Sequence, residues 1–221
     1  MVFFEKTYPA PKSLEVEFKK ANGSYKELDV LEQLHSDFKN KCYICESKGI
    51  ESINIEHFAP HKNQNKIRKF NWSNLFWACS HCNQIKSDRE PFLNSILKSD
   101  AVDVNIKYLL NDDFSKNQVV IEAISNDIKT QNTAQLLKDI YSGTTMQNKF
   151  QAREKRNRLY DEMCDFTNLI SKYFRTEDRE KKEELLITIK YELSNKSAFT
   201  AFKRCFIKEN SKFNSLVKYT Q

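Results

Sequence analysis

Four of the six cysteines are spaced as ligands of one metal ion. They form two Cys-x-x-Cys pairs, Cys42/Cys45 and Cys79/Cys82, and 33 residues lie between the pairs. A turn of this spacing brings two thiolates to one ion, and two such turns complete a tetrahedral Zn²⁺ site. Two matched pairs favour metal ligands over a redox pair or disulfides. Because protein ligands would fill all four positions, we expect the zinc to be structural.

An acidic residue and a histidine lie between the cysteine pairs. Residues 52–56 alternate like a short strand, which would end with Glu56 and His57 shortly before Pro60. The second cysteine pair leads into residues 82–87, a predicted helix start with Asn83 near its N-cap. A carboxylate and an amide oxygen can hold Mg²⁺, and a histidine is the natural general base at neutral pH. These residue types are consistent with a second, exchangeable metal ion beside a general base.

The segments CYICE, IEHFAPH and NWSNLFWACSHCNQIKS resemble the HNH nuclease motif in its zinc-bound ββα-metal form. The resemblance implies that His57 is the general base, and that Glu56 and Asn83 hold a catalytic Mg²⁺ or Mn²⁺. It also implies that Asn74 holds the loop that orients His57, and that Lys86 faces the backbone phosphates. Asn83 stands where many members have histidine, a departure that keeps a metal ligand.

Sequence outside this motif is similar to the PtuB family, the HNH subunits of Septu anti-phage defence systems and of related retron-linked systems. The similarity lies in the Gly-Ser-Tyr and Asp-Val elements before the first cysteine pair and in residues 197–202 (SAFTAF), together with the FWAC-x-x-CN core of residues 76–83. The family implies an ATPase partner of the PtuA type that carries and controls the nuclease.

Basic residues gather in the same stretch of a chain whose formal net charge is +6. The candidate nucleic-acid contacts are His61, Lys62, Lys66, Arg68, Lys69 and Lys86. A cationic face suits a polyanion, because each neutralised phosphate releases counterions. A solvated surface would have the same composition. We expect DNA as the substrate. An RNA-cleaving nuclease acting on tRNA and a non-catalytic zinc-knuckle binding module remain as alternatives.

Several other residues are expected to be structural. The aromatic residues near the second cysteine pair are expected to fill the core rather than to stack on bases: Trp72, Phe76 and Trp77. His81 is expected to face solvent or a nucleic-acid backbone. A basic run is expected on the exposed face of a helix: Arg153, Lys155, Arg156 and Arg158. Cys164 and Cys205 lie on apolar helical faces, so we expect their thiols to be in the core.

The elements that must position these residues fall into two regions. Apolar spacing predicts a helix near Leu28–Phe38, one or two short strands in residues 105–125, and helices almost throughout from residue 132. One helical face is marked by Leu159, Met163, Phe166, Ile170, Tyr173 and Phe174. We therefore predict an α+β, mainly α-helical protein. Its N-terminal segment and zinc-bound HNH domain would span residues 1–95, and its helical domain residues 96–221.

Composition excludes several classes of protein. Hydrophobic residues make up 39% of the 221 residues and aromatic residues 12%, which is enough for a packed core and argues against overall disorder. The longest apolar run, residues 75–79, is far shorter than the ~20 residues that cross a bilayer. The N-terminal sequence MVFFEKTYP lacks the pattern of a signal peptide. We expect a cytoplasmic protein with no membrane partner.

Overall fold

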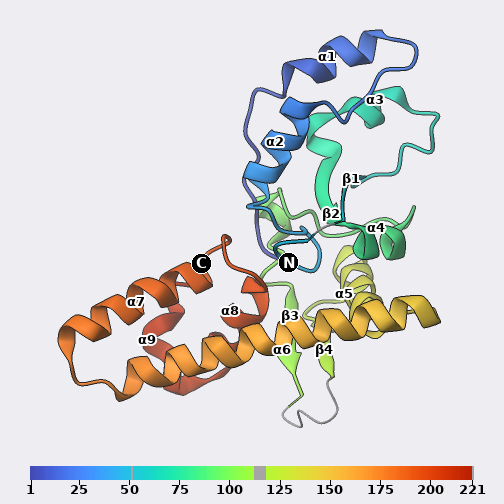
Figure 1. Ribbon diagram of the computed structural model, residues 1–221. Helices are drawn as coiled ribbons and strands as arrows, with labels where there is room; N and C mark the ends of the chain where they lie inside the picture. Colours follow the sequence, from blue (N-terminus) through green and yellow to red (C-terminus); the bar gives the residue numbers. More distant parts are fainter. Residues whose placement is uncertain (51, 112–117, 221) are drawn as a thin grey trace.

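The computed structural model describes residues 1–50, 52–111 and 118–220, and its architecture is α+β as predicted (Figure 1). The chain begins with two short helices, α1 (Lys12–Lys19) and α2 (Leu28–Asp37). Helix α2 confirms the helix predicted near Leu28–Phe38. It buries Val30 and Leu34, four residues apart on one face.

A small antiparallel hairpin and a helix follow the first cysteine pair. Strand β1 (Ile53–His57) pairs with β2 (Leu75–Cys79), and His57 lies opposite Leu75 in the register. The short helix α3 (Lys66–Phe70) and a 3₁₀ turn (Trp72–Asn74) lie in the connection between these strands. Strand β2 is buried at every position, as its sequence LFWAC requires, and it runs directly into α4 (Ser80–Lys86). The result is the ββα arrangement, with the predicted strand shifted by one residue.

The start of α4 corrects one prediction. The helix begins at Ser80 with Cys79 as its N-cap, so Asn83 lies within the helix and not at its cap. The strand continues into the helix without a loop, because Cys79 keeps an extended backbone and the next residue is already helical.

A second hairpin connects the ββα unit to the helical region. Strands β3 (Ile106–Leu110) and β4 (Val119–Ala123) pair antiparallel, with Tyr108 opposite Ile121. Both of these side chains are buried, whereas Lys107 and Glu122 alternate with them outside the core. The pair confirms the strands predicted within residues 105–125.

Helices form most of the remaining chain. They are α5 (Ile128–Ser142), α6 (Met146–Arg175), α7 (Arg179–Leu193), α8 (Thr200–Glu209) and α9 (Asn214–Val217). Helix α6 crosses the other elements and leads into α7, which folds back along it (Figure 1). The buried stripe of α6 recurs every three or four residues: Asn148, Ala152, Lys155, Leu159, Met163, Phe166 and Ile170. Four of the six residues predicted for this face are therefore buried, whereas Tyr173 is half-buried and Phe174 exposed.

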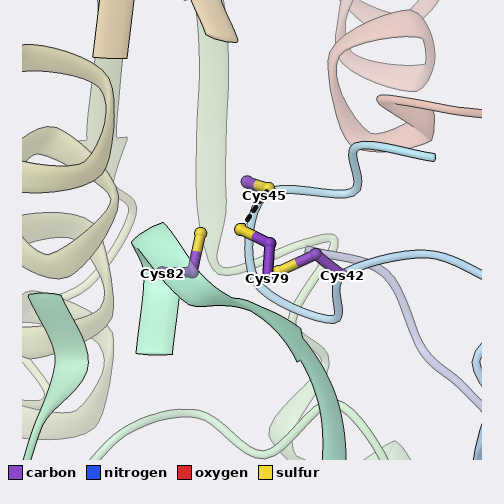
Figure 2. A group of neighbouring side chains, drawn as sticks. All are labelled: Cys42, Cys45, Cys79 and Cys82. Atoms are coloured by element: carbon purple, nitrogen blue, oxygen red, sulfur yellow. Dashed lines mark hydrogen bonds between the residues drawn. The ribbon is translucent and has the colours of Figure 1, made fainter. Parts of the chain in front are cut away.

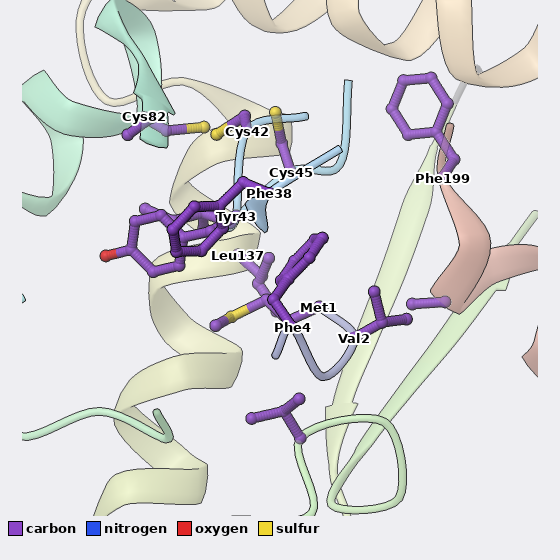
Figure 3. Close-up of a cluster of buried hydrophobic side chains, with 14 of the residues drawn as sticks. Met1, Val2, Phe4, Phe38, Cys42, Tyr43, Cys45, Cys82, Leu137 and Phe199 are labelled. Carbon is purple, nitrogen blue, oxygen red and sulfur yellow. The ribbon is translucent and has the colours of Figure 1, made fainter. Parts of the chain in front are cut away.

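One hydrophobic core extends across both regions of the chain. Figure 3 shows Phe4 and Tyr43 from the N-terminal part beside Leu137 from α5. The Tyr141 hydroxyl on α5 donates to the Cys45 carbonyl oxygen at 3.2 Å. The division into residues 1–95 and 96–221 stays a prediction, and the core contacts cross its boundary.

No helix in the described ranges is both long enough and apolar enough to cross a lipid bilayer.

Candidate functional site

The four predicted zinc ligands lie together at the junction of two elements. Cys42 and Cys45 lie in the loop after α2, and Cys79 and Cys82 lie where β2 meets α4 (Figure 2). Their sulfur atoms lie within 4.8 Å of one another, and all four residues are buried. Thiolates held at ~2.3 Å from a tetrahedral zinc lie roughly 3.8 Å apart, so the cluster fits this ion. The four cysteines are positioned to bind a metal ion, consistent with zinc.

Backbone hydrogen bonds give the first cysteine loop its shape. The Glu46 amide donates to the Cys42 carbonyl at 2.9 Å, and the Cys42 amide donates to the Ser47 carbonyl at 3.1 Å. The Tyr43 amide donates to the Trp77 carbonyl at 2.9 Å and so attaches the loop to β2. The first cysteine pair is therefore aligned with Cys79 and Cys82, where β2 meets α4.

Glu56, at the penultimate position of β1, is buried in a pair with Lys86 of α4. The Lys86 ammonium lies 2.6 Å from Glu56 Oε1 and also donates to the His57 carbonyl at 3.2 Å. The Tyr43 hydroxyl donates to Glu56 Oε2 at 2.9 Å. Burial raises the pKa of the Glu56 carboxyl, whereas Lys86 and Tyr43 oppose this shift. Each carboxylate oxygen thus has one protein partner.

His57, the last residue of β1, is held at one ring nitrogen. Its Nε2 lies 3.0 Å from the Lys69 carbonyl oxygen. A carbonyl only accepts, so Nε2 carries the proton and Nδ1 keeps its lone pair in the neutral ring. Burial lowers the pKa of His57 to about 4, so the imidazole is neutral at pH 7. The rings of Tyr25 and His61 contact it edge-on, with centroid distances of 4.7 and 4.3 Å.

The buried Asn74 side chain fixes the loop between β1 and α3. Its Oδ1 accepts from the Ala59 amide at 2.7 Å, and its Nδ2 donates to the carbonyls of Ala59 at 2.9 Å and Arg68 at 3.0 Å. The second carbonyl immediately precedes Lys69, whose own carbonyl bonds to His57. Asn74 therefore holds both sides of the loop beside His57.

Glu56, His57 and Asn83 open onto one cleft, with a volume of about 340 Å³. The cleft is also lined by Tyr25, Ile55, Pro60, His61, Lys62, Asn63, Ser87 and Asp88. A carboxylate offers about four lone-pair sites, so Glu56 keeps acceptor capacity beyond its two partners. A carboxylate and an amide oxygen are hard donors of the kind that Mg²⁺ and Mn²⁺ take. The donor set therefore fits such an ion, whose assignment stays a prediction.

Comparison with known protein families identifies the segment that carries both sites. The model of the HNH endonuclease family matches residues 42–89. These residues form an HNH endonuclease domain. The match begins at the first zinc-ligand candidate and includes β1, β2 and α4. No curated protein and no solved structure matches the chain.

Most of the predicted nucleic-acid contacts lie on one side of the HNH domain. Lys62 is exposed and lines the cleft together with the half-buried His61. Lys66 and Arg68 are exposed on α3, and Lys69 is half-buried there. These five residues are accessible to a ligand, and their binding role stays a prediction.

Lys86 differs from its expected position and does not face solvent. Its side chain is fully buried, and its ammonium is bonded to Glu56 and to the His57 carbonyl. The expectation that Lys86 faces backbone phosphates is therefore corrected. Lys86 is buried because α4 packs on β1, which places residue 86 beneath the cleft.

The aromatic residues of the HNH domain belong to the core, as predicted. Trp72, Phe76 and Trp77 are all buried, and Phe76 packs against Tyr43 with a centroid distance of 4.7 Å. Their rings therefore fill the space between β2 and its neighbours.

Two expectations, one about a residue near the predicted zinc ligands and one about a helical residue, are wrong. His81 is buried, and its ring nitrogens lie 2.9 Å from the Gln151 side chain and the Ile140 carbonyl, so it does not face solvent. Cys164 is exposed on α6 rather than in the core, whereas Cys205 is half-buried and packs against the core. Both cysteines lie at the edge of the apolar face of their helix, where the spacing of apolar residues does not determine whether a side chain is buried.

The structure places two further residues beside the candidate sites. The sequence analysis did not assign either of them to a site. Tyr25 comes from the segment before α2 and contacts His57, yet nothing in its sequence context indicates this position. Lys155, predicted on an exposed face, is buried with its ammonium beside Cys45. Its spacing in the sequence could have indicated this burial, because it lies four residues before Leu159 in the buried stripe of α6.

Proposed function

We propose that the chain is a metal-dependent endonuclease that hydrolyses phosphodiester bonds of DNA. The observation that carries this proposal is the cleft of the HNH domain. There, His57 lies beside Glu56 and Asn83 and is held at Nε2 by the Lys69 carbonyl. A histidine fixed at one nitrogen presents the other to a reactant in a defined orientation.

His57 acts as the general base in this proposal. Its Nδ1 accepts a proton from the water that attacks the phosphorus, while Nε2 remains bonded to the Lys69 carbonyl. Asn74 keeps that carbonyl in place through its bonds to both sides of the loop. The imidazole is neutral before the reaction, as a base requires.

Glu56 and Asn83 would hold the divalent cation, Mg²⁺ or Mn²⁺, that the HNH family implies. When bound, such an ion supplies positive charge for the developing negative charge on the phosphate oxygens. The Lys86 ammonium at 2.6 Å opposes the rise that burial causes in the pKa of the Glu56 carboxyl, and so favours the ionised form that binds a cation. Lys86 thus supports the site from beneath the cleft.

The basic residues around the cleft would bind the nucleic-acid backbone. We assign this role to His61, Lys62, Lys66, Arg68 and Lys69. Phosphate contacts of this kind position a substrate without selecting its sequence. They also attract RNA, so an RNase acting on tRNA is the alternative within the same mechanism.

The cleavage experiment separates these substrates. Purified zinc-containing protein is incubated with duplex plasmid DNA and, separately, with total tRNA, each with Mg²⁺, Mn²⁺ or EDTA. We expect cleavage of DNA that depends on the added metal. Cleavage of tRNA alone would replace DNA with RNA, and binding without cleavage under every metal condition would favour the non-catalytic zinc-knuckle module.

We further propose that a PtuA-type ATPase carries this nuclease in anti-phage defence, in the cytoplasm. The support for this step is the sequence similarity to the PtuB family described above. Helix α7 offers exposed apolar side chains to a partner, among them Ile187 at 68% and Tyr191 at 46% exposure. Co-expression with an ATPase encoded beside the gene should give one co-purifying complex. Separate elution of the two proteins would contradict the partnership.

A further inference from the structure

A buried ammonium group lies against the cysteine cluster. Lys155 Nζ is 3.2 Å from Cys45 Sγ and 3.7 Å from Cys79 Sγ. It is also 3.3 Å from Ser47 Oγ, in the loop that follows the first cysteine pair. The residue is 9% exposed, so its charge has been removed from bulk water.

The opposite charges of the Lys155 ammonium and of a zinc–thiolate centre explain why both can be buried. Four thiolates around one Zn²⁺ carry a net charge of about −2. A buried charge is costly unless an opposite charge or hydrogen bonds compensate it, and an isolated buried ammonium has the same difficulty. Lys155 donates hydrogen bonds to the sulfur ligands, and its positive charge offsets part of their excess negative charge. The metal centre, in turn, gives the ammonium a partner.

The position of Lys155 on α6 is fixed by neighbouring contacts. Gln151, one turn earlier, lies 2.9 Å from Nδ1 of His81, which stands between the cysteines of the second pair. From α5, Tyr141 bonds to the Cys45 carbonyl. Lys155 itself occupies the buried stripe of α6 between Ala152 and Leu159. The helical region beyond the HNH match therefore closes one side of the metal centre.

We propose that Lys155 is a positioning residue of the zinc centre, and that its positive charge holds the zinc–thiolate cluster in its tightly binding form. The HNH segment of residues 42–89 thus lacks one component of its own metal site, and α6 supplies it. This inference rests on the four-cysteine zinc centre and is independent of whether the cleft cleaves nucleic acid.

Zinc retention by the full chain tests the proposal. Zinc-loaded parent, Lys155→Gln and Lys149→Gln proteins are mixed with an excess of a chromogenic zinc chelator, and the rate of zinc transfer is followed. Lys149 is an exposed lysine on the same helix, so its variant is the matched control. We expect Lys155→Gln to lose zinc about 10- to 100-fold faster, the range typical of groups that support metal ligands. The control should match the parent.

Cobalt reports on the sulfur ligands directly. In Co²⁺-substituted protein, the ammonium stabilises the sulfur electron pairs and raises the energy of the sulfur-to-cobalt charge-transfer band. We expect this band to move to longer wavelength in Lys155→Gln and to remain unchanged in Lys149→Gln. A role of Lys155 in packing alone would leave both the band and the zinc-transfer rate at their parent values, and that result would overturn the proposal.

Lys155→Arg keeps the proposal testable if Lys155→Gln does not fold. Arginine retains the positive charge, so we expect this variant to fold and to retain zinc far longer than the neutral variant. If Lys155→Arg loses zinc as fast as Lys155→Gln, or fails to fold as that variant does, positive charge is not what the centre requires and the proposal is wrong.

Discussion

The ammonium nitrogen of Lys86 lies 2.6 Å from Oε1 of Glu56, and both side chains are buried beneath the cleft of the HNH domain. Removing one partner of a buried ion pair leaves the other charge without compensation, at a typical cost of 3–5 kcal/mol. Lys86→Met should therefore lower the free energy of unfolding by about 3–5 kcal/mol, measured by urea denaturation.

Two further variants make this prediction specific. Glu56→Gln combined with Lys86→Met should recover part of the loss, because the remaining amide is uncharged. Lys181→Met, at an exposed position of α7, should change stability little. A Lys86→Met protein as stable as the parent would show that the pair is not needed to bury Glu56.

Asn74 should support both stability and cleavage. Asn74→Ala removes three hydrogen bonds to part-buried backbone groups of the loop, and each such bond typically contributes about 0.5–1.5 kcal/mol to stability. The loop that presents the Lys69 carbonyl to His57 would loosen, so we expect a fall in kcat with little change in KM. Asn168→Ala, at an exposed position of α6, is the control. Equal kcat in the two variants would contradict a positioning role for Asn74.

The zinc of the cysteine cluster and the divalent cation of the cleft should respond differently to a chelator. The cysteine cluster is buried, whereas Glu56 and Asn83 line an open cleft. Brief EDTA treatment should therefore abolish cleavage, and added Mg²⁺ or Mn²⁺ should restore it, while one zinc per chain remains by elemental analysis. Cys82→Ser should lower the zinc content and the melting temperature together. A zinc-free parent protein of unchanged melting temperature would refute the structural zinc.

The basic side of the HNH domain should determine the salt dependence of binding. Lys62 and Lys66 are exposed there, and each phosphate contact that is lost reduces the slope of log K against log salt by about 0.9 for duplex DNA. Lys62→Glu/Lys66→Glu should weaken duplex binding, measured by fluorescence anisotropy between low and moderate salt. Lys181→Glu/Lys190→Glu on α7 provides the same change of charge elsewhere. Equal affinities for the two double variants would remove the basic side from the interface.

The sequence predicted those features that local pattern determines. Two Cys-x-x-Cys pairs lead to one cluster of four cysteines because each turn fixes its own pair of sulfur atoms. The alternation before His57 likewise predicts β1 to within one residue. In α6, the apolar spacing correctly identified the buried face at Leu159 and Met163.

The features that were missed depend on contacts between distant segments. Lys86 is charged, and only the packing of α4 on β1 shows that its partner is the buried Glu56. Lys155 follows the spacing of a buried stripe, but burial of a lysine requires a negative partner that lies 110 residues away in the sequence. Tyr25 contacts His57 through tertiary packing alone. Periodicity does not carry this information.

The central claim, that His57 is the general base of a phosphodiesterase, is tested most directly by one pair of variants. Duplex DNA cleavage is measured for zinc-loaded parent, His57→Ala and His35→Ala proteins with Mg²⁺ and with Mn²⁺. His35 is exposed on α2 and outside the cleft, so its variant should cleave like the parent. His57→Ala should be slower by at least ~10²–10⁴-fold, with an unchanged circular dichroism spectrum and zinc content. Cleavage by folded His57→Ala at the parent rate would contradict the account.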